Sequence, residues 1–210
     1  MNIKPAIIPY TLSELETKMD VFKNQTDWVH LDVVDGKFAA GASWNNPIDL
    51  ELIDGRAKIE VHLMVEKPED VVSSWVTVVD RLIMHIESTD HLDVLLESLQ
   101  HTNIKIGLAL LFETPLDQIE PYLQTKQIDL VQLMSIENIG HHGEEFSVAT
   151  LEKIKNLREM WPEGVIQVDG GINLEIVSEV LAAGASSVVV GSALWNSVDP
   201  VDTFEQFKKI

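Results

Sequence analysis

The chain has 210 residues, 45% of them hydrophobic, and 34 acidic against 15 basic residues give a net charge of −19. This size predicts one domain over residues 1–210 with a sizeable core, and the charge argues against nucleic acid and against an anionic membrane. A small phosphorylated ligand is not excluded, because backbone amides can bind phosphate without Lys or Arg. There is no cysteine, which excludes disulfides and thiolate ligands. Without a signal-peptide pattern or an apolar run near the roughly 18 residues of a membrane helix, we expect a cytoplasmic protein.

Short apolar, β-branched runs alternate with stretches of helical periodicity along the whole chain. Helices are expected at residues 12–22, 68–78, 91–99, 116–123, 148–160, 174–183 and 201–208, with a short one at 47–53. The eight runs read as strands are expected to end near Ile8, Val33, Leu63, His85, Ala109, Met134, Asp169 and Gly191.

Strands that alternate with helices pair in parallel through right-handed crossovers. Eight such units predict an α/β fold of the (β/α)8 TIM-barrel type, for which roughly 200 residues is the lower limit. The alternative is an open, doubly wound sheet. The barrel is favoured because polar residues gather at the C-terminal ends of at least four strands rather than at one switch point.

The second predicted strand carries polar side chains where a buried parallel strand should be apolar. His30 and Asp32 are two residues apart, so they point to the same face. His62 lies near the end of the third strand and Asp169 at the end of the seventh. Two histidines and two carboxylates from three strands would make a divalent-metal site.

The mixture of nitrogen and oxygen ligands suits one divalent transition metal, Zn²⁺, Mn²⁺, Fe²⁺ or Co²⁺, better than Ca²⁺ or Mg²⁺. A metal that bridges a ketone and the neighbouring hydroxyl would lower the cost of an enediolate. Carboxylates on opposite faces could remove a proton from one side and return one on the other. Inversion of a carbon next to a carbonyl needs this arrangement of one electrophile and two proton-transferring groups.

Each of these residues also has a structural interpretation. A single inward histidine such as His62 is more often a hydrogen-bonded structural group. Asp169 could cap the following helix, and His30 and Asp32 could simply pair with each other. Their joint placement at strand ends favours the site.

Other polar residues are expected to point into the barrel. His85 and Glu87 are two apart on the fourth strand and would form a supporting or structural pair. Gln132 and Gln167 would fill the interior with hydrogen bonds.

Glycines follow the last two strands, in residues 169–173 and 190–194. In (β/α)8 barrels the loops after strands seven and eight often bind phosphate through backbone N–H groups, which glycine lets approach closely. The alternative is that these glycines only make tight turns.

Five segments resemble signature segments of the ribulose-phosphate 3-epimerase family in order and spacing: residues 30–38, 61–65, 84–87, 168–173 and 190–193. The resemblance implies a barrel of the ribulose-phosphate-binding type, a homo-oligomer, and interconversion of D-ribulose 5-phosphate and D-xylulose 5-phosphate in the pentose phosphate pathway. It implies the metal ligands His30, Asp32, His62 and Asp169. Of these, Asp32 and Asp169 would be the acid/base pair, and the phosphate would bind at Gly170, Gly171, Gly191 and Ser192.

The first two strands depart from the family pattern. Residues 5–9 lack two serines, so a hydroxyl near the substrate is lost, and Val34 stands in place of a methionine.

The largest departure is residues 134–146, where the family has a glycine-rich loop that folds over substrate and phosphate. Gly140 and Gly143 remain as hinges or amide donors. His141 and His142 are expected to contact an anionic substrate when protonated, with adventitious metal binding or plain solvation as alternatives. Acidic residues follow directly at 144 and 145 and would repel a nearby phosphate.

Two other functions fit the same sequence. One is a related barrel acting on another phosphosugar, as a hexulose-phosphate epimerase, a decarboxylase or an aldolase, although two histidine ligands fit a Mg²⁺-dependent decarboxylase poorly. The other is a non-catalytic phosphosugar-binding barrel. The missing serines and the altered loop support it, and the four metal-site residues speak against it.

Overall fold

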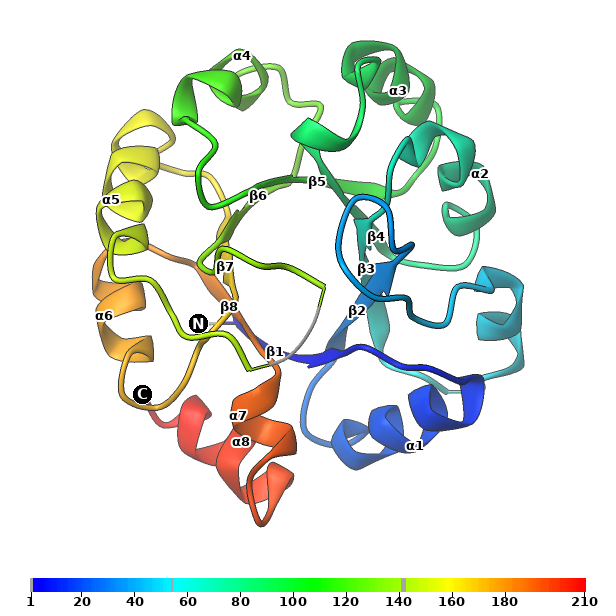
Figure 1. The fold of residues 1–210 in the computed structure, drawn as a ribbon, viewed down its shortest axis with the longest axis vertical. Coiled ribbons are helices and arrows are strands. Elements are labelled where there is room, and N and C mark those ends of the chain that lie inside the picture. The colour runs from blue at the N-terminus through cyan, green and yellow to red at the C-terminus, as the bar shows by residue number, and fades with distance from the viewer. Residues whose placement is uncertain (1, 54, 141–142) are drawn as a thin grey trace.

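The computed structural model describes residues 2–53, 55–140 and 143–210. Eight parallel strands pair in chain order and close into a barrel, with β8 next to β1 (Figure 1). This confirms the predicted fold. The strands are β1 (Asn2–Ile7), β2 (Trp28–Val34), β3 (Lys58–Met64), β4 (Arg81–His85), β5 (Lys105–Leu110), β6 (Leu130–Met134), β7 (Ile166–Asp169) and β8 (Ser187–Val190).

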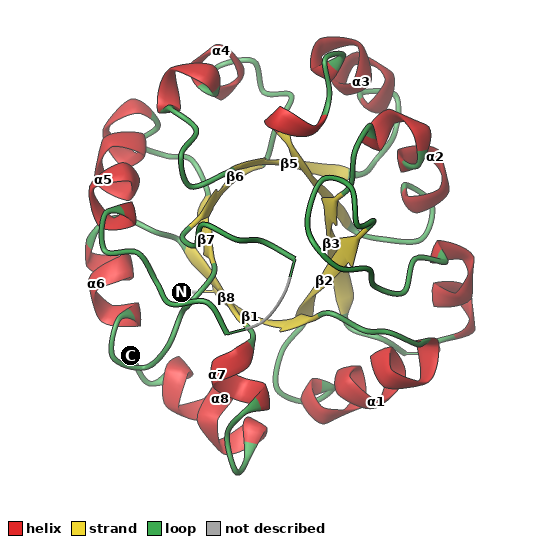
Figure 2. Cartoon of the chain, viewed as in Figure 1, coloured by secondary structure: helices red, strands yellow, loops and turns green. Residues whose placement is uncertain are grey.

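Helices surround the barrel on its outer side (Figure 2). Short 3₁₀ helices at Pro47–Leu52, Pro68–Asp70, Ile86–Ser88 and Leu116–Gln118 interrupt the connections. The α-helices are α1 (Leu12–Phe22), α2 (Val72–Trp75), α3 (Leu92–Leu99), α4 (Glu120–Leu123), α5 (Thr150–Met160), α6 (Val177–Ala182), α7 (Ser192–Trp195) and α8 (Pro200–Lys208).

The predicted strand ends are within one residue of those observed, but several predicted helices are wrong in extent. Residues 68–78 and 116–123 each form a 3₁₀ turn followed by one short helix. In the second case Pro121 has no N–H to continue the turn into a longer helix. In the segment 174–183, the Asn173 side chain accepts hydrogen bonds from the N–H groups of Glu175 and Ile176, and α6 begins only at Val177.

The two faces of the strands differ in polarity. Val29, Leu31 and Val33 of β2 belong to the large apolar core, which also contains helix residues such as Leu15 and Phe22. Buried polar residues, by contrast, include alternate positions of the same strands: Lys4, His30, Asp32, Glu60, His62, Gln132, Gln167 and Ser187. The apolar layer thus lies between barrel and helices, and the polar side chains share the barrel interior. No helix among the described residues is long and apolar enough to span a membrane.

Candidate metal centre and active site

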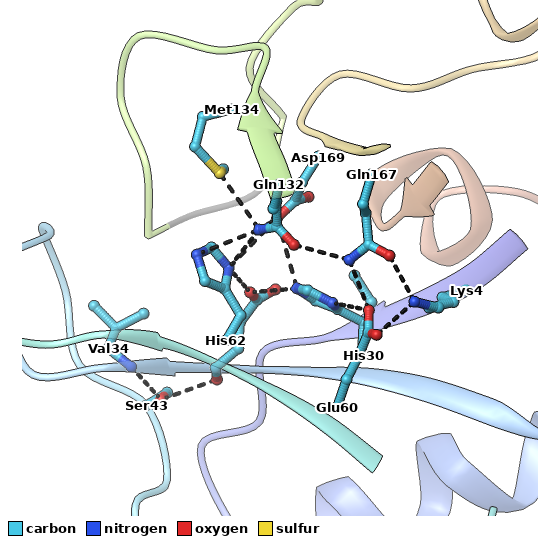
Figure 3. A network of polar contacts seen from close by, with 12 residues as sticks. Lys4, His30, Val34, Ser43, Glu60, His62, Gln132, Met134, Gln167 and Asp169 are labelled. Carbon is cyan, nitrogen blue, oxygen red and sulfur yellow. Dashed lines mark hydrogen bonds and ion pairs between the residues drawn. The ribbon is translucent and has the colours of Figure 1, made fainter. Parts of the chain in front are cut away.

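The four predicted metal ligands come together at the C-terminal side of the barrel. Asp32 and His62 are direct neighbours in the register of β2 and β3, and Asp169 is the last residue of β7. One ligand atom from each of these residues and from His30 lies within 4.8 Å of the others, and all four residues are buried. Three strands separated in the sequence therefore present two imidazoles and two carboxylates to one point (Figure 3).

Imidazole nitrogens and carboxylate oxygens alternate around this point. Oδ1 of Asp32 lies 2.9 Å from Nδ1 of His62 and 3.2 Å from Nε2 of His30. Oδ2 of Asp169 lies 3.4 Å and 3.6 Å from the same two nitrogens. All of these contacts use one oxygen of each carboxylate, which leaves Asp32 Oδ2 and Asp169 Oδ1 outside this set of contacts.

The orientation of His30 fits a bound cation. Its Nδ1 lies 2.8 Å from Oε1 of Glu60, which is fully buried. An ionised carboxylate can only accept, so Nδ1 donates and the neutral ring carries its lone pair on Nε2. That Nε2 atom is buried, forms no hydrogen bond, and faces the oxygens of Asp32 and Asp169. A nitrogen lone pair and two carboxylates repel one another, so this arrangement is stable only if a positive charge lies between them.

The electrostatics of the cluster agree with this interpretation. Burial disfavours the charged imidazole of His30, but the Asp32 carboxylate beside it and the bond to Glu60 outweigh burial and raise its pKa to about 10. The pKa of His62 is raised in the same way, against burial, by Asp169 and Asp32. The pKa of Asp32 is held below its usual range, since the two histidines outweigh its burial. The cluster thus favours positive charge at its centre, as a proton or as a cation that replaces it.

A second line of contacts supports His62 from β4. Nε2 of His62 lies 2.9 Å from Nε2 of His85, and Nδ1 of His85 lies 3.3 Å from Oε2 of Glu87. Glu87 also accepts from the N–H of Leu111 and the hydroxyl of Thr114. With Nδ1 of His62 turned to the cluster, its Nε2–H donates to His85, and His85 donates to Glu87.

The expected placement of His85 and Glu87 on one strand face is wrong. β4 ends at His85, and Glu87 lies in the 3₁₀ turn Ile86–Ser88. The turn nevertheless returns the Glu87 carboxylate to His85.

The predicted phosphate-binding residues lie beside the two carboxylates. One pocket is lined by Asp32 and Asp169 and by the glycine segments after β6, β7 and β8. His141 and His142 fall outside the described residues. The glycine segments contribute six residues to the lining of the pocket: Gly140, Gly143, Gly170, Gly171, Gly191 and Ser192.

The loop after β6 reaches over the open end of the barrel (Figure 2). It approaches Gly171 so closely that a Cβ on this glycine, whose φ is +65°, would lie 2.2 Å from the nitrogen of Phe146. Earlier in the loop, Ile136 and Ile139 form a small apolar cluster with Val34 and Met134. Glu144 lines the pocket as well.

The sequence predictions missed the residues behind the site. Glu60 orients His30, and Lys4 and Arg81 both bind the other oxygen of Glu60. A signal was present, because Glu60 stands two residues before His62 on β3, as His30 stands before Asp32 on β2. Gln132 and Gln167 fill the interior with hydrogen bonds as predicted.

Comparisons with known proteins identify the family to which the chain is similar. Residues 2–195 match the model of the ribulose-phosphate 3 epimerase family. The chain is 31% identical to the ribulose-phosphate 3-epimerase of Bacillus subtilis, over 95% of this chain and 94% of the relative. It is 34% identical to that of Synechocystis, over 93% of this chain and 87% of the relative.

Solved structures share the fold at lower identity. KGPDC from Streptococcus mutans has a TM-score of 0.74 at 16% identity, over 99% of this chain and 95% of the other. Orotidine 5'-monophosphate decarboxylase from Methanocaldococcus jannaschii has a TM-score of 0.74 at 14% identity, over 99% and 97%. At such identities the likeness concerns the barrel alone.

Proposed function

Since the chain belongs to the ribulose-phosphate 3-epimerase family, we propose that it is a metal-dependent epimerase that inverts C3 of a ketose phosphate. Its substrate is D-ribulose 5-phosphate and its product D-xylulose 5-phosphate. One observation supports this most directly. Asp32 and Asp169, from β2 and β7, line one pocket together, and each places one oxygen in the cluster with His30 and His62.

In the proposed reaction the two carboxylates exchange protons with C3 from opposite faces of the substrate. One takes the C3 proton, which leaves an enediolate across C2 and C3, and the other gives a proton to the opposite face. In the reverse direction the roles are exchanged. Asp32 Oδ2 and Asp169 Oδ1 are the atoms for this task, because Asp32 Oδ1 and Asp169 Oδ2 contact the histidines.

The group that His30, Asp32, His62 and Asp169 would hold is one divalent transition-metal ion, which supplies positive charge beside the substrate oxygens. Two imidazoles and two carboxylates favour Zn²⁺, Mn²⁺, Fe²⁺ or Co²⁺. Glu60 and His85 keep the two imidazoles in the orientation that turns a lone pair toward this position.

The substrate phosphate is proposed to bind at the glycine end of the same pocket. Backbone N–H groups of Gly170, Gly171, Gly191 and Ser192 would donate to it, with Gly140 and Gly143 contributing from the loop after β6. The support is their position in one lining with both carboxylates. Contact of His141 or His142 with the anionic substrate stays part of the proposal.

Cytoplasmic location and assembly into homo-oligomers belong to the same proposal. The location is supported by a relative, a cytoplasmic isoform from rice that is 27% identical over 99% of this chain, and the homo-oligomer follows only from the resemblance to the family.

Elemental analysis of the purified protein, combined with turnover on a panel of ketose phosphates, tests the function. We expect about one equivalent of a transition metal per chain and preferential conversion of D-ribulose 5-phosphate. Bound metal with no turnover of any phosphosugar would contradict the proposal and favour a binding barrel. Preferential turnover of a hexulose phosphate would contradict the assigned substrate.

A further inference from the structure

A line of hydrogen bonds crosses the barrel interior from β1 to Asp169 (Figure 3). Nζ of Lys4 donates to Oε1 of Gln167 at 2.6 Å, and Nε2 of Gln167 donates to Oε1 of Gln132 at 2.8 Å. Nε2 of Gln132 then donates to Oδ2 of Asp169 at 3.0 Å. Lys4, Gln167 and Gln132 are each at most 1% exposed, so protein groups rather than solvent decide how these amides point.

Lys4 fixes the orientation of the Gln167 amide, and with it the donor-to-acceptor direction of the line. A lysine ammonium can only donate, so the atom of Gln167 that faces Lys4 must be its oxygen. The hydroxyl of Ser187 donates to the same oxygen at 3.0 Å. The NH2 group of Gln167 is thereby turned to acceptors, Oε1 of Glu60 at 2.7 Å and Oε1 of Gln132.

The orientation of Gln167 in turn fixes the orientation of the Gln132 amide. Because the oxygen of Gln132 accepts from Gln167, its NH2 group must face Asp169. In the flipped orientation, the Gln132 oxygen would lie against a carboxylate oxygen at hydrogen-bond distance, and two acceptors repel each other. The line therefore ends in a donor aimed at one oxygen of Asp169.

The second carboxylate has no part in this line. Asp32 is held through its contacts with His30 and His62, and none of Lys4, Gln167 or Gln132 contacts it in the described part of the chain. Both carboxylates contact His30 and His62, but in the described part of the chain only Asp169 also accepts from Gln132. A change in the line should therefore act first on Asp169.

We infer that Gln132 is a positioning residue for Asp169, and that Lys4 and Gln167 act on Asp169 through it by fixing the orientation of its amide. By holding Oδ2, Gln132 directs Oδ1 of Asp169 to the substrate. The inference rests on the proposed function for the role of Asp169 in proton transfer. The hydrogen-bond geometry itself does not depend on it.

The Gln132 amide nitrogen has other neighbours that the test must separate. It lies 3.2 Å from Nδ1 and 3.4 Å from Nε2 of His62, and 3.5 Å from Sδ of Met134. A loss of Gln132 that acted through His62 would weaken cation binding and slow proton exchange on both substrate faces. A loss that acts through Asp169 slows exchange on one face.

The central variant is Gln132→Met, which keeps the length of the side chain and removes the donor. Proton NMR in D2O follows two rates for each epimer separately: loss of the C3 proton signal and conversion to the other epimer. We expect conversion to fall about 30-fold, in the range typical of lost positioning groups. For the epimer that Asp169 deprotonates, exchange at C3 should fall by the same factor as conversion. For the epimer that Asp32 deprotonates, exchange should stay within about threefold of wild type.

Ser187→Ala is the matched control. It also removes a buried hydrogen bond to Gln167, but Lys4 still fixes that amide, so all rates should stay within about twofold of wild type. Lys4→Met should slow conversion in the wild-type background. Because Lys4 also pairs with Glu60 behind His30, only the part of its effect that acts through Gln132 should be lost in the Gln132→Met background. Circular dichroism and the Tm establish that each variant is folded.

Cation affinity gives a readout that needs no ketose. In competition with a chromophoric chelator, using Zn²⁺ as the probe, Gln132→Met should bind about tenfold more weakly than wild type and Ser187→Ala equally well. Equal loss of exchange on both epimers, or unchanged affinity and rates in Gln132→Met, would overturn the inference. If wild-type protein exchanges no C3 proton on any ketose phosphate, the proposed function fails, and the affinity comparison still decides whether Gln132 supports the His30, Asp32, His62 and Asp169 cluster.

Discussion

The pocket has two ends, and their residues are held in place in different ways. At the metal end, His30 and His62 are fully buried, and a further layer of side chains that includes Glu60 and His85 fixes their rings. At the glycine end, the lining is backbone and a loop whose Gly143 is exposed. Site side chains on buried strands tolerate few substitutions, whereas a loop that binds through backbone amides can vary in sequence and still bind. The departures from the family pattern after β6 lie at this second end.

The largest expected effect breaks the metal end itself. Asp32→Asn or Asp169→Asn removes a ligand charge and a proton carrier together, so epimerisation should fall by about three orders of magnitude or more. Circular dichroism should show a folded barrel, since both residues line the pocket. Turnover near that of the wild type in either variant would contradict the assigned roles.

The next effect tests the support of His30. Glu60→Gln keeps the shape of the side chain but leaves Lys4 and Arg81 beside a neutral group in the interior. Removing one partner of a buried charge network costs about 3–5 kcal/mol of unfolding free energy. Urea unfolding should report this loss, together with weaker cation binding. A variant as stable as the wild type would show that these charges are compensated elsewhere.

The support of His62 should matter less for stability and mainly for metal binding. His85→Ala removes the acceptor of the His62 Nε2–H, and the affinity for a transition-metal ion should fall about 10-fold to 100-fold. His91→Ala, at an exposed histidine next to α3, is the matched control and should leave the affinity unchanged. Equal affinities in the two variants would contradict the supporting role of His85.

A change at the glycine end should affect substrate binding more than catalysis. Gly171→Ala places a Cβ against the backbone of Phe146 at a residue with positive φ, and we expect KM to rise about tenfold with little change in kcat. Gly55→Ala has a similar φ of +59° and no neighbour within 4 Å, so it carries the backbone strain without the clash. A kcat loss in Gly171→Ala as large as that of an Asp169 variant would remove the distinction between the two ends.

The smallest effect concerns charge at the glycine end. Glu144→Gln removes one negative charge from the pocket lining, and the KM for a phosphorylated ketose should fall about twofold to threefold at low ionic strength. The difference should shrink as salt is added, because Glu144 is only half-buried and salt screens charges that solvent reaches. A KM that rises instead would show that the Glu144 carboxylate helps to hold the loop after β6 in place.

Much of the barrel and the first layer of the site could be predicted from the sequence, because both rest on a period of two. His30 and Asp32 stand out against Val29, Leu31 and Val33, and strand ends follow from the apolar runs. The orientation of Gln132 could not be predicted, since it depends on which side chains meet across the closed barrel. Helices were less predictable, because Pro121 and the turn at Asn173 shorten segments whose apolar periodicity is longer.

The same limit explains the supporting layer. Glu60 meets Lys4 and Arg81 only because β1, β3 and β4 lie in one closed sheet with a particular register. The local sequence of β3 does not specify its register with β1 and β4. A polar residue two positions before a predicted ligand on the same strand is, however, a signal that can be used in other barrels.

The measurement that tests the central claim most directly is the fate of the C3 proton of D-ribulose 5-phosphate in D2O, followed by NMR with metal-loaded protein. We predict that the C3 proton signal disappears while D-xylulose 5-phosphate forms. Both processes should stop after chelation and resume when Zn²⁺, Mn²⁺, Fe²⁺ or Co²⁺ is restored. A folded, metal-loaded protein that leaves the C3 proton in place would contradict the account.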